Sequence, residues 1–335
     1  MKKMLSIKDI AVEAGVSITT VSFILNGKAK EKAISEVVTK KVEKIIKESG
    51  YKPNQLARSL RTGHSNIIGL IVEDISNPFF ATIAKMIEYR AYKKGYKIIY
   101  SSTENDVEKA KDLINMFKSR KVDAYIISPI KGIEEDIQML LNEHKTVVLF
   151  DRDLEGLDVD YVGVDHFNGS SEATAHLVAN GRKNIAFVTT DLAIKQIIDR
   201  FDGYKEILKK HKLFNEKLIV KIPFNQTAEN GEKQMKKLFT ENEVDGVLFA
   251  TNYLAISGLM VLKAIDKKID KNFEVIAYDD HIVFKLVDPQ ISAVEQPLEE
   301  IADKIIDLTL TRLSSKEKRP SQQIVFPAKL ILRKA

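Results

Sequence analysis

The chain has no cysteine, and its six histidines never occur as a close pair. Without cysteine there can be no disulfide, no thiolate zinc site and no cysteine nucleophile. The dispersed histidines argue against a histidine-rich metal site, so we expect neither a metal nor another cofactor. The sequence also lacks a phosphate loop, a dinucleotide fingerprint, a nucleophile elbow and an HExxH motif. These absences leave little basis for an enzyme.

Long apolar runs are also missing. No run approaches the roughly 18 residues that a membrane-spanning helix needs, and the first nine residues lack the apolar stretch of a secretory signal. We therefore expect a cytoplasmic protein without membrane contacts. The 335 residues, of which 44% are hydrophobic and 30% charged, predict two or three domains with sizeable cores.

Positive charge is concentrated at the N-terminus. Residues 1–62 hold 13 lysine and arginine residues against 6 aspartate and glutamate residues, whereas the remainder holds 39 against 41. Such concentration favours a polyanionic partner for the first segment and a separately folded, nearly neutral body. A solvated, lysine-rich helix would explain the charge equally well.

The first fifty residues carry the pattern of three short helices. In the first, four apolar residues follow helical spacing: Ile7, Ile10, Ala11 and Ala14. Gly15 ends this helix, and Ser17 caps the next. In a third helix the apolar positions are Val38, Val42, Ile45 and Ile46, between a capping Ser35 and a terminating Gly50.

The second helix divides into an inner and an outer face. Its inward residues are predicted to be Ile18, Val21, Ile24 and Leu25. Four others, spaced i, i+3, i+4 and i+7, form a predicted outward stripe: Thr19, Ser22, Phe23 and Asn26. Two helices joined by a glycine turn, the second with an exposed face, are typical of a helix-turn-helix. A helical hairpin within another kind of domain is the alternative.

A very short helix is predicted over 55–61, with Asn54 as its cap and Gly63 after its end. About seven residues are too few to form a stable isolated helix in water. We therefore expect the segment to become ordered only against a partner and DNA. A structural linker helix is the alternative.

From Ile67 onward, strand-like apolar runs alternate with helical patterns, which predicts parallel sheets covered by helices. The strand-like runs are Ile68–Val72, Ile98–Ser101, Ala124–Ile127, Val147–Phe150, Tyr161–Val164, Ile185–Val188, Leu218–Ile222, Val247–Ala250 and Val275–Tyr278. The intervening helical patterns include Phe79–Lys94, Val107–Ser119, Ser170–Asn180, Thr227–Phe239, Leu254–Lys267 and Leu298–Leu313. These are too many strands for one sheet, so the fold class is α/β with two similar subdomains.

Open α/β sheets bind ligands beyond the carboxyl ends of their strands. Polar residues stand at several such positions: Asp74, Ser76, Asn77, Asp151, Arg152, Asp153, Asn252, Asp279, Asp280 and His281. Carboxylates there suit a ligand with hydroxyl groups. They could also act as an acid and base pair, so a carbohydrate-binding or glycoside-cleaving α/β protein remains an alternative.

Several motifs together resemble the LacI family of lactose-repressor-type transcription regulators. They are Ser6–Ser17, Thr20–Gly27, Gly50–Gly63, Ile68–Val72 and Asp74–Phe80, and the resemblance extends through nearly the whole chain. It implies a helix-turn-helix domain over 1–53, a hinge helix over 54–63 and an effector-binding and dimerisation body over 64–335. The body would resemble periplasmic binding proteins, with crossovers between its subdomains near 160, 292 and 323.

The resemblance also implies site residues. The expected DNA contacts are Ser17, Ile18, Thr19, Thr20, Ser22, Phe23, Asn26, Lys28, Asn54, Ala57, Arg58 and Leu60, with Leu60 matching the leucine that enters the minor groove. The expected effector contacts are Asn77, Phe79, Asp151, Arg200, Asn252, Asp279 and Gln296. No residue is expected to be catalytic or to bind metal.

Four features depart from common family patterns. Phe23 stands where many relatives carry arginine, and the loop 27–34 is about three residues longer and contains Lys28, Lys30 and Lys32. Asn252 stands where aspartate is frequent, and Gln196 where a small hydroxyl residue often precedes the arginine.

The function that the resemblance implies is that of a repressor rather than an activator, which binds double-stranded operator DNA as a homodimer or a tetramer. Its effector is expected to be sugar-like, and the operator sequence stays open.

Overall fold

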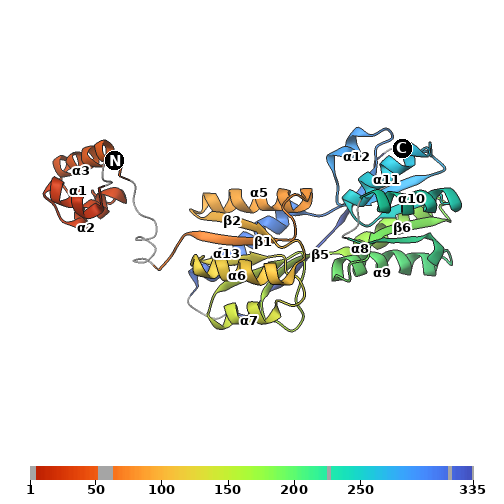
Figure 1. Cartoon of the computed structure of the whole chain (residues 1–335), viewed down its shortest axis with the longest axis horizontal. Coiled ribbons are helices and arrows are strands. Elements are labelled where there is room, and N and C mark those ends of the chain that lie inside the picture. Colours follow the sequence, from red (N-terminus) through yellow and green to blue (C-terminus); the bar gives the residue numbers. More distant parts are fainter. Residues whose placement is uncertain (1–4, 52–62, 225–227, 316–318, 334–335) are drawn as a thin grey trace. The chain divides into compact units, whose positions relative to one another are not determined.

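The computed structural model describes residues 5–51, 63–224, 228–315 and 319–333. The chain divides into two compact units, Met1–Ser65 and Asn66–Ala335, and each is considered by itself (Figure 1). The predicted hinge contacts Asn54, Ala57, Arg58 and Leu60 lie outside the described residues.

The N-terminal unit contains three helices, α1 (Ile7–Ala14), α2 (Ile18–Leu25) and α3 (Glu36–Ser49). Their ends are set by the residues that the sequence indicated. Gly15 and Gly50 adopt left-handed backbone conformations at the ends of α1 and α3, and Ser17 accepts a hydrogen bond from the Thr20 backbone N–H. Ile10, Val21 and Val42 are fully buried where the three helices meet.

The larger unit contains two six-stranded sheets in its described part. The first has the order β11-β5-β4-β3-β1-β2, and its strands are β1 (Ile67–Val72), β2 (Lys97–Ser102), β3 (Ala124–Ile127), β4 (Thr146–Phe150), β5 (Asp160–Asp165) and β11 (Gln323–Pro327). The second has the order β12-β10-β9-β8-β6-β7, and its strands are β6 (Ile185–Thr190), β7 (Ile219–Ile222), β8 (Gly246–Phe249), β9 (Glu274–Tyr278), β10 (Ser292–Glu295) and β12 (Lys329–Ile331). The described pairs are parallel except for the antiparallel pair of β10 and β12. The α/β fold class predicted from the sequence is confirmed.

Helices cover both faces of each sheet (Figure 1). Around the first sheet these are α5 (Pro78–Lys93), α6 (Val107–Ser119), α7 (Glu134–Asn142) and α13 (Leu298–Ser314). Around the second they are α8 (His166–Ala179), α9 (Lys195–Lys210), α10 (Ala228–Glu241), α11 (Asn252–Ala264) and α12 (Ile282–Leu286), with a 3-10 turn at Glu216–Leu218. Leu218 therefore precedes β7 rather than beginning it, which corrects the predicted strand boundary.

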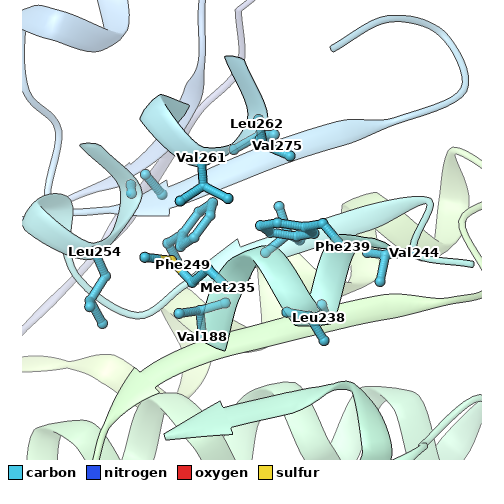
Figure 2. Close-up of a cluster of buried hydrophobic side chains, with 14 of the residues drawn as sticks. Val188, Met235, Leu238, Phe239, Val244, Phe249, Leu254, Val261, Leu262 and Val275 are labelled. Atoms are coloured by element: carbon cyan, nitrogen blue, oxygen red, sulfur yellow. The ribbon is translucent and has the colours of Figure 1, made fainter. Parts of the chain in front are cut away.

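The central strands could be predicted from their apolar runs because both of their faces are buried. A sheet with helices on both faces buries both sides of its strands, so the strands become almost continuously apolar. Figure 2 shows one such core, in which Phe249 of β8 packs with Leu254 and Val261 of α11 and with Met235 and Phe239 of α10. Phe249 is fully buried.

The chain passes between the two sheets three times. It leaves the first sheet after β5, returns after β10 to form α13, and crosses again between β11 and β12. These passages follow Asp165, Glu295 and Pro327, each a few residues after the positions expected near 160, 292 and 323. Asp160, at the start of β5, is buried and accepts two hydrogen bonds from the Arg312 guanidinium at 2.6 and 2.7 Å.

Candidate functional site

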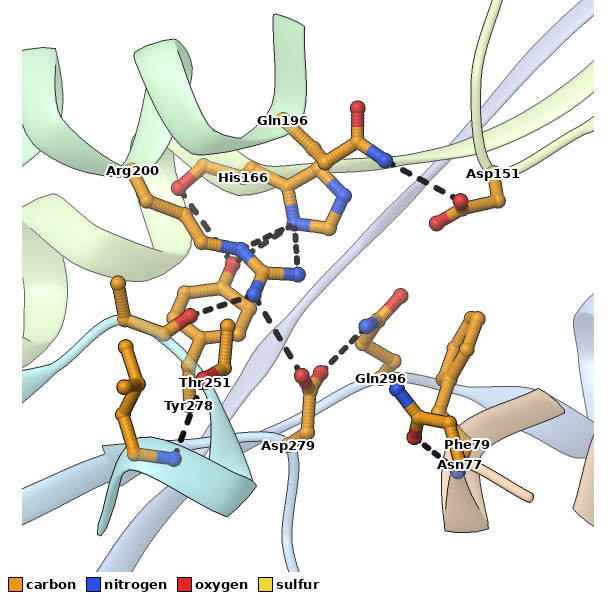
Figure 3. Close-up of polar contacts among 12 residues, drawn as sticks. Asn77, Phe79, Asp151, His166, Gln196, Arg200, Thr251, Tyr278, Asp279 and Gln296 are labelled. Carbon is orange, nitrogen blue, oxygen red and sulfur yellow. Dashed lines mark hydrogen bonds and ion pairs between the residues drawn. The ribbon is translucent and has the colours of Figure 1, made fainter. Parts of the chain in front are cut away.

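Six of the seven predicted effector contacts line one small cavity between the subdomains, and Figure 3 shows them facing one another. They are Asn77, Phe79, Asp151, Arg200, Asp279 and Gln296. The cavity encloses about 60 Å³. The seventh, Asn252, is buried and instead lines an adjoining pocket of about 550 Å³, which also contains Phe79 and Asp279.

Asp151 and Asp279 occupy equivalent positions in the two subdomains. Asp151 follows β4 and Asp279 follows β9, and each of these strands is third in its sheet order. Both residues have left-handed backbones, with φ of 64° and 65°. This conformation is unfavourable for most side chains, although Asp tolerates it better than others, and such residues gather at functional sites. The repeated turn places one carboxylate from each subdomain in the same cavity.

The Asp151 carboxylate connects the two subdomains. It accepts hydrogen bonds from Ser128 Oγ at 3.2 Å and from Gln196 Nε2 at 3.1 Å. Ser128 follows β3 of the first sheet, whereas Gln196 lies on α9 beside the second. Burial raises the pKa of Asp151 to about 7, with a smaller raising effect from Asp279 and opposing effects from Arg200 and Ser128.

Arg200 lines the side of the cavity that the second subdomain forms. It is buried, one turn after Gln196 on α9. Its guanidinium donates to the Ala250 carbonyl at 2.6 Å and to Asp279 at 3.4 Å, and it lies 3.7 Å from the centre of the Tyr278 ring. Gln296 donates a further hydrogen bond to Asp279. Asp279 is therefore oriented from two sides (Figure 3).

The first subdomain contributes an aromatic wall. Phe79 and Phe80 at the start of α5 pack edge to face, with their ring centres 4.9 Å apart. Asn77 caps this helix by accepting a hydrogen bond from the Phe79 backbone N–H at 3.0 Å. The side-chain amide oxygen of Asn77 therefore helps to fix the position of Phe79.

The sequence did not identify a buried ion pair that also lines the cavity. Arg152 is paired with Glu73 at the end of β1, and both residues are buried. Arg152 also donates to Asn105 at 2.7 Å, and burial lowers the pKa of Arg152 to about 10. The position of Arg152 directly after Asp151 was a usable signal, whereas nothing in the sequence pointed to Glu73.

The predicted DNA-reading face of α2 is only partly as expected. Thr19 and Asn26 are exposed, and Phe23 is half-buried with the Lys32 ammonium 5.7 Å from the centre of its ring. Ser22, however, is only 8% exposed, and its backbone carbonyl accepts a hydrogen bond from Asn26 Nδ2 at 2.6 Å. The predicted outward position of Ser22 is wrong, because its side chain is buried in the folded unit.

Ile18 also differs from its predicted inward position, because 46% of it is exposed. It is the first residue of α2, beyond the reach of the core formed with α1 and α3. Ser17 and Thr20 form the helix cap, with their hydroxyl oxygens 2.9 Å apart. In the loop 27–34, Lys28, Lys30 and Lys32 are exposed, and Lys32 pairs with Glu31 at 3.0 Å.

Within the described residues, no group of three or more His, Cys, Asp and Glu side chains could hold a metal ion. None of the helices in that part of the chain is long and apolar enough to cross a membrane.

Comparison with known families matches both parts of the chain. The family of bacterial regulatory proteins named after lacI matches residues 6–54, and the periplasmic binding protein-like domain matches residues 174–335. The sucrose operon repressor of Lactococcus lactis subsp. lactis is 30% identical over 311 residues, which cover 92% of this chain and 94% of that protein.

Solved structures show the same fold. The lac repressor dimer bound to operator and the anti-inducer ONPF superposes with a TM-score of 0.85 at 20% identity, over 99% of this chain and 98% of that one. A LacI family regulator from Enterococcus faecium with bound ribose gives a TM-score of 0.71 at 24% identity, over 80% of this chain and 97% of that one.

Proposed function

We propose, given that the chain belongs to the LacI family of bacterial transcription regulators, that a sugar-like effector in the cleft controls its affinity for operator DNA. The protein acts in the cytoplasm as a repressor, and as a dimer, with a tetramer as the alternative assembly. The effector contacts are the six residues of the central cavity together with Asn252 in the adjoining pocket.

The observation that carries this proposal is the pair of equivalent aspartates facing Arg200. Asp151 and Asp279 accept hydrogen bonds, and Arg200 donates them, so together they can satisfy several hydroxyl groups of one ligand. The Phe79 ring supplies a flat apolar surface beside them. A sugar ring, with hydroxyl groups on its edges and C–H groups on its faces, suits this combination. The sucrose operon repressor and the ribose-bound relative lend support.

The size of the cavity indicates how a ligand would act. Ligand sites usually enclose roughly 300–1,000 Å³, whereas this cavity holds about 60 Å³. The hydrogen bond between Asp151 and Gln196 joins the subdomains across it. A ring that occupies this central cavity would exchange this bond for bonds to the ligand, and such an exchange would change the angle between the subdomains.

The DNA-binding half of the proposal rests on the helix-turn-helix unit. Two copies of α2 would enter successive major grooves of a near-palindromic operator. Thr19, Phe23 and Asn26 lie on the accessible surface of α2 for base contacts. Because Phe cannot form the bidentate bonds of arginine, Phe23 would contact apolar features such as a thymine methyl group. The exposed lysines of the loop 27–34 would contact phosphates.

Dimer formation has support in exposed apolar side chains of the larger unit. On α5, Tyr89 and Tyr92 are 59% and 74% exposed, and on α12, Ile282 and Leu286 are 60% and 76% exposed. Groups of large apolar side chains at a protein surface mark interaction sites. Both helices also line the 550 Å³ pocket, so a partner covering them would lie beside the ligand cleft.

The glycoside-cleaving alternative is not favoured. The family to which the chain belongs consists of transcription regulators. In addition, each carboxylate is held by neighbouring donors, Asp151 by Ser128 and Gln196, and Asp279 by Arg200 and Gln296. Such fixed acceptors suit the recognition of hydroxyl groups.

The proposal can be tested by first selecting operator sequences from random DNA. Operator affinity is then measured by fluorescence anisotropy with a panel of monosaccharides, disaccharides and nucleobases. We expect at least one sugar to change operator affinity by about 5- to 150-fold. The Asp279→Asn variant should lose this response and keep its affinity for operator in the absence of sugar.

Asp266→Asn provides the matched control, because Asp266 is exposed and also has a left-handed backbone, with φ of 54°. This control should respond to the sugar as the wild type does. An unaltered response of Asp279→Asn would contradict the assignment of the cleft. A response to nucleobases alone would contradict the sugar-like effector.

A further inference from the structure

A second pocket lies at the crossover edge of the same cleft. It encloses about 390 Å³, within the usual range for ligand sites. Its walls come from both subdomains: Tyr161 and Val325 belong to β5 and β11 of the first sheet, and Lys195 and Asp199 to α9 of the second subdomain. Asp151 and Gln196 line both this pocket and the central cavity, and their hydrogen bond separates the two spaces.

The buried side chain of His166 contributes to this second pocket. His166 is only 3% exposed and begins α8, where the chain first passes between the subdomains. Its Nδ1 lies 3.1 Å from the Tyr278 hydroxyl and accepts a hydrogen bond from Arg200 Nε at 3.4 Å. Because arginine only donates, Nδ1 carries no proton, and the proton of the neutral ring is on Nε2.

The Nε2 atom of His166 is buried and has no hydrogen-bond partner among the described residues. In Figure 3 this edge of the ring points to the side on which Gln196 and Asp151 lie. Burial, with the neighbouring Arg200, holds the pKa of His166 well below its usual range, so the ring stays neutral. A buried donor without an acceptor is costly, so a ligand oxygen that reaches Nε2 when the subdomain angle changes would be favoured.

The remaining polar groups of the pocket complement that donor. Carboxylates of Asp153, Asp165 and Asp199 accept hydrogen bonds, and the Lys195 ammonium donates them. Between these groups stand the apolar surfaces of Tyr161, Val164 and Val325. Acceptors, donors and apolar patches in one enclosed space match the surface of a ring that carries several hydroxyl groups.

We propose that this crossover pocket binds a second hydroxyl-rich ring next to the central cavity, with His166 Nε2–H donating to one of its oxygens. The inference rests on the proposed function, since it extends the same effector cleft. The ring is either the second unit of a disaccharide or a separate monosaccharide. In both cases it contacts both subdomains and adds to the control of their angle.

The test uses the full chain and fills the crossover pocket from its exposed rim. Val325 lines the pocket and is 55% exposed, so Val325→Trp can occupy the space without altering the central cavity. Leu332→Trp is the matched control, because Leu332 is equally exposed and lines neither pocket. Lys195→Met removes a donor from the rim without adding bulk. Calorimetry would use ribose, xylose, glucose, sucrose, cellobiose, maltose and trehalose as probes.

We expect one of two results in the wild type: a disaccharide that binds one per chain, or a monosaccharide that binds two per chain. The first identifies a single two-ring ligand and the second two separate rings. Val325→Trp should weaken the disaccharide, or the second monosaccharide, by at least about tenfold. Lys195→Met should weaken the same event, and Leu332→Trp should leave it unchanged.

The inference is overturned if every sugar that binds does so once per chain with unchanged affinity in Val325→Trp and Lys195→Met. Failure of all the sugars to bind overturns it as well. The proposed function can stand in the first case, provided that Asp279→Asn loses sugar binding. If Asp279→Asn binds sugar normally while Val325→Trp does not, the crossover pocket stands and the central assignment fails.

Discussion

Individual residues set the chemistry of the cleft, and Asp151 is the most sensitive of them to pH. Its side chain is 6% exposed, and its pKa is raised from 3.8 to about 7. Between pH 3.8 and about pH 7, the Asp151 carboxyl is deprotonated in the unfolded chain but still protonated in the folded protein. The contribution of Asp151 to the free energy of unfolding is therefore complete below about pH 4 and is lost as the pH rises through about 7.

Asp151→Asn should remove this pH dependence, because asparagine stays neutral and can still accept the hydrogen bonds of Ser128 and Gln196. Relative to wild type, the variant should be more stable at pH 8 than at pH 5, by at most about 3 kcal/mol, because the wild type loses stability between pH 5 and about pH 7 and each pKa unit is worth about 1.4 kcal/mol. Urea unfolding at both pH values measures this. The same stability difference from wild type at both pH values would show that the Asp151 carboxyl is not perturbed.

Phe23 is the one aromatic side chain on the predicted DNA-reading face of α2, and it is half-buried. Phe23→Ala should change the sequence preference of the protein and also remove the contact with Lys32. Because Phe23 makes no charge contact with phosphates, affinity for random DNA should fall by less than about threefold. Selection of bound sequences, followed by anisotropy on random DNA, separates the two effects. The same selected sequence in wild type and variant would show that Phe23 does not face the bases.

For individual residues, the sequence predicted which charged side chains meet at the strand ends. It predicted less well which side chains of a short helix are exposed. Strand ends converge by topology, so Asp151 and Asp279 meet without any knowledge of distances. Arg200 lies within α9, and only the resemblance to the family indicated it. An eight-residue helix such as α2 has two turns, and its neighbours decide which side of each turn is covered. Ser22 and Ile18 were misplaced for that reason.

Among the elements of the N-terminal unit, the loop 27–34 carries three exposed lysines. Its turn is closed by backbone hydrogen bonds from Lys32 to Lys28 and from Ile34 to Ala29, so the lysines are carried on an ordered loop. Replacing Lys28, Lys30 and Lys32 together by alanine should weaken binding to all DNA sequences. The slope of log affinity against log salt should fall by about 0.9 for each lost phosphate contact. A slope equal to that of wild type would exclude the loop from the interface.

Helix α9 positions both Gln196 and Arg200, and it lies close to α8. A Cβ at Gly203 would come within 2.3 Å of the Phe167 backbone carbonyl, which a side-chain movement cannot relieve. Gly203→Ala should therefore displace α9, lower the free energy of unfolding by about 1–3 kcal/mol and weaken the effector.

Gly231→Ala is the control for that substitution. At Gly231 on α10 the nearest atom to a new Cβ is a side-chain carbon of Ile222 at 3.2 Å. This change should be close to neutral, because the higher helix propensity of alanine offsets the tighter contact. Urea unfolding and calorimetry with the effector would report both variants, and equal stability for the two would contradict the close approach of α8 and α9.

The strands that the sequence did not reveal are those at the crossovers. Residues of β11 alternate between exposed and half-buried, and β12 has only three residues. Neither forms the continuous apolar run that marks the central strands, and β10 has only two apolar residues, Ala293 and Val294, between Ser292 and Glu295. The partners of Asp151 across the cleft were equally unpredictable, because the sequence alone does not say which distant side chains touch.

On the scale of the whole molecule, the proposed regulation depends on one equilibrium that both effector and operator DNA bias. The larger unit presents groups from both subdomains to a single cavity, and the N-terminal unit carries the helix-turn-helix. Suppose that the subdomain angle sets the affinity of the protein for operator DNA. The effector must then change the protein's affinity for operator by the same factor by which operator changes its affinity for the effector. This reciprocity does not depend on whether the effector induces or represses.

The most direct measurement is therefore a pair of titrations on the full chain. Operator affinity is measured with and without saturating effector, and effector affinity with and without saturating operator. The account predicts two factors that are equal, larger than about fivefold, and lost together in Asp279→Asn. A sugar that binds the wild type, fails to bind Asp279→Asn, and yet leaves operator affinity unchanged would contradict it.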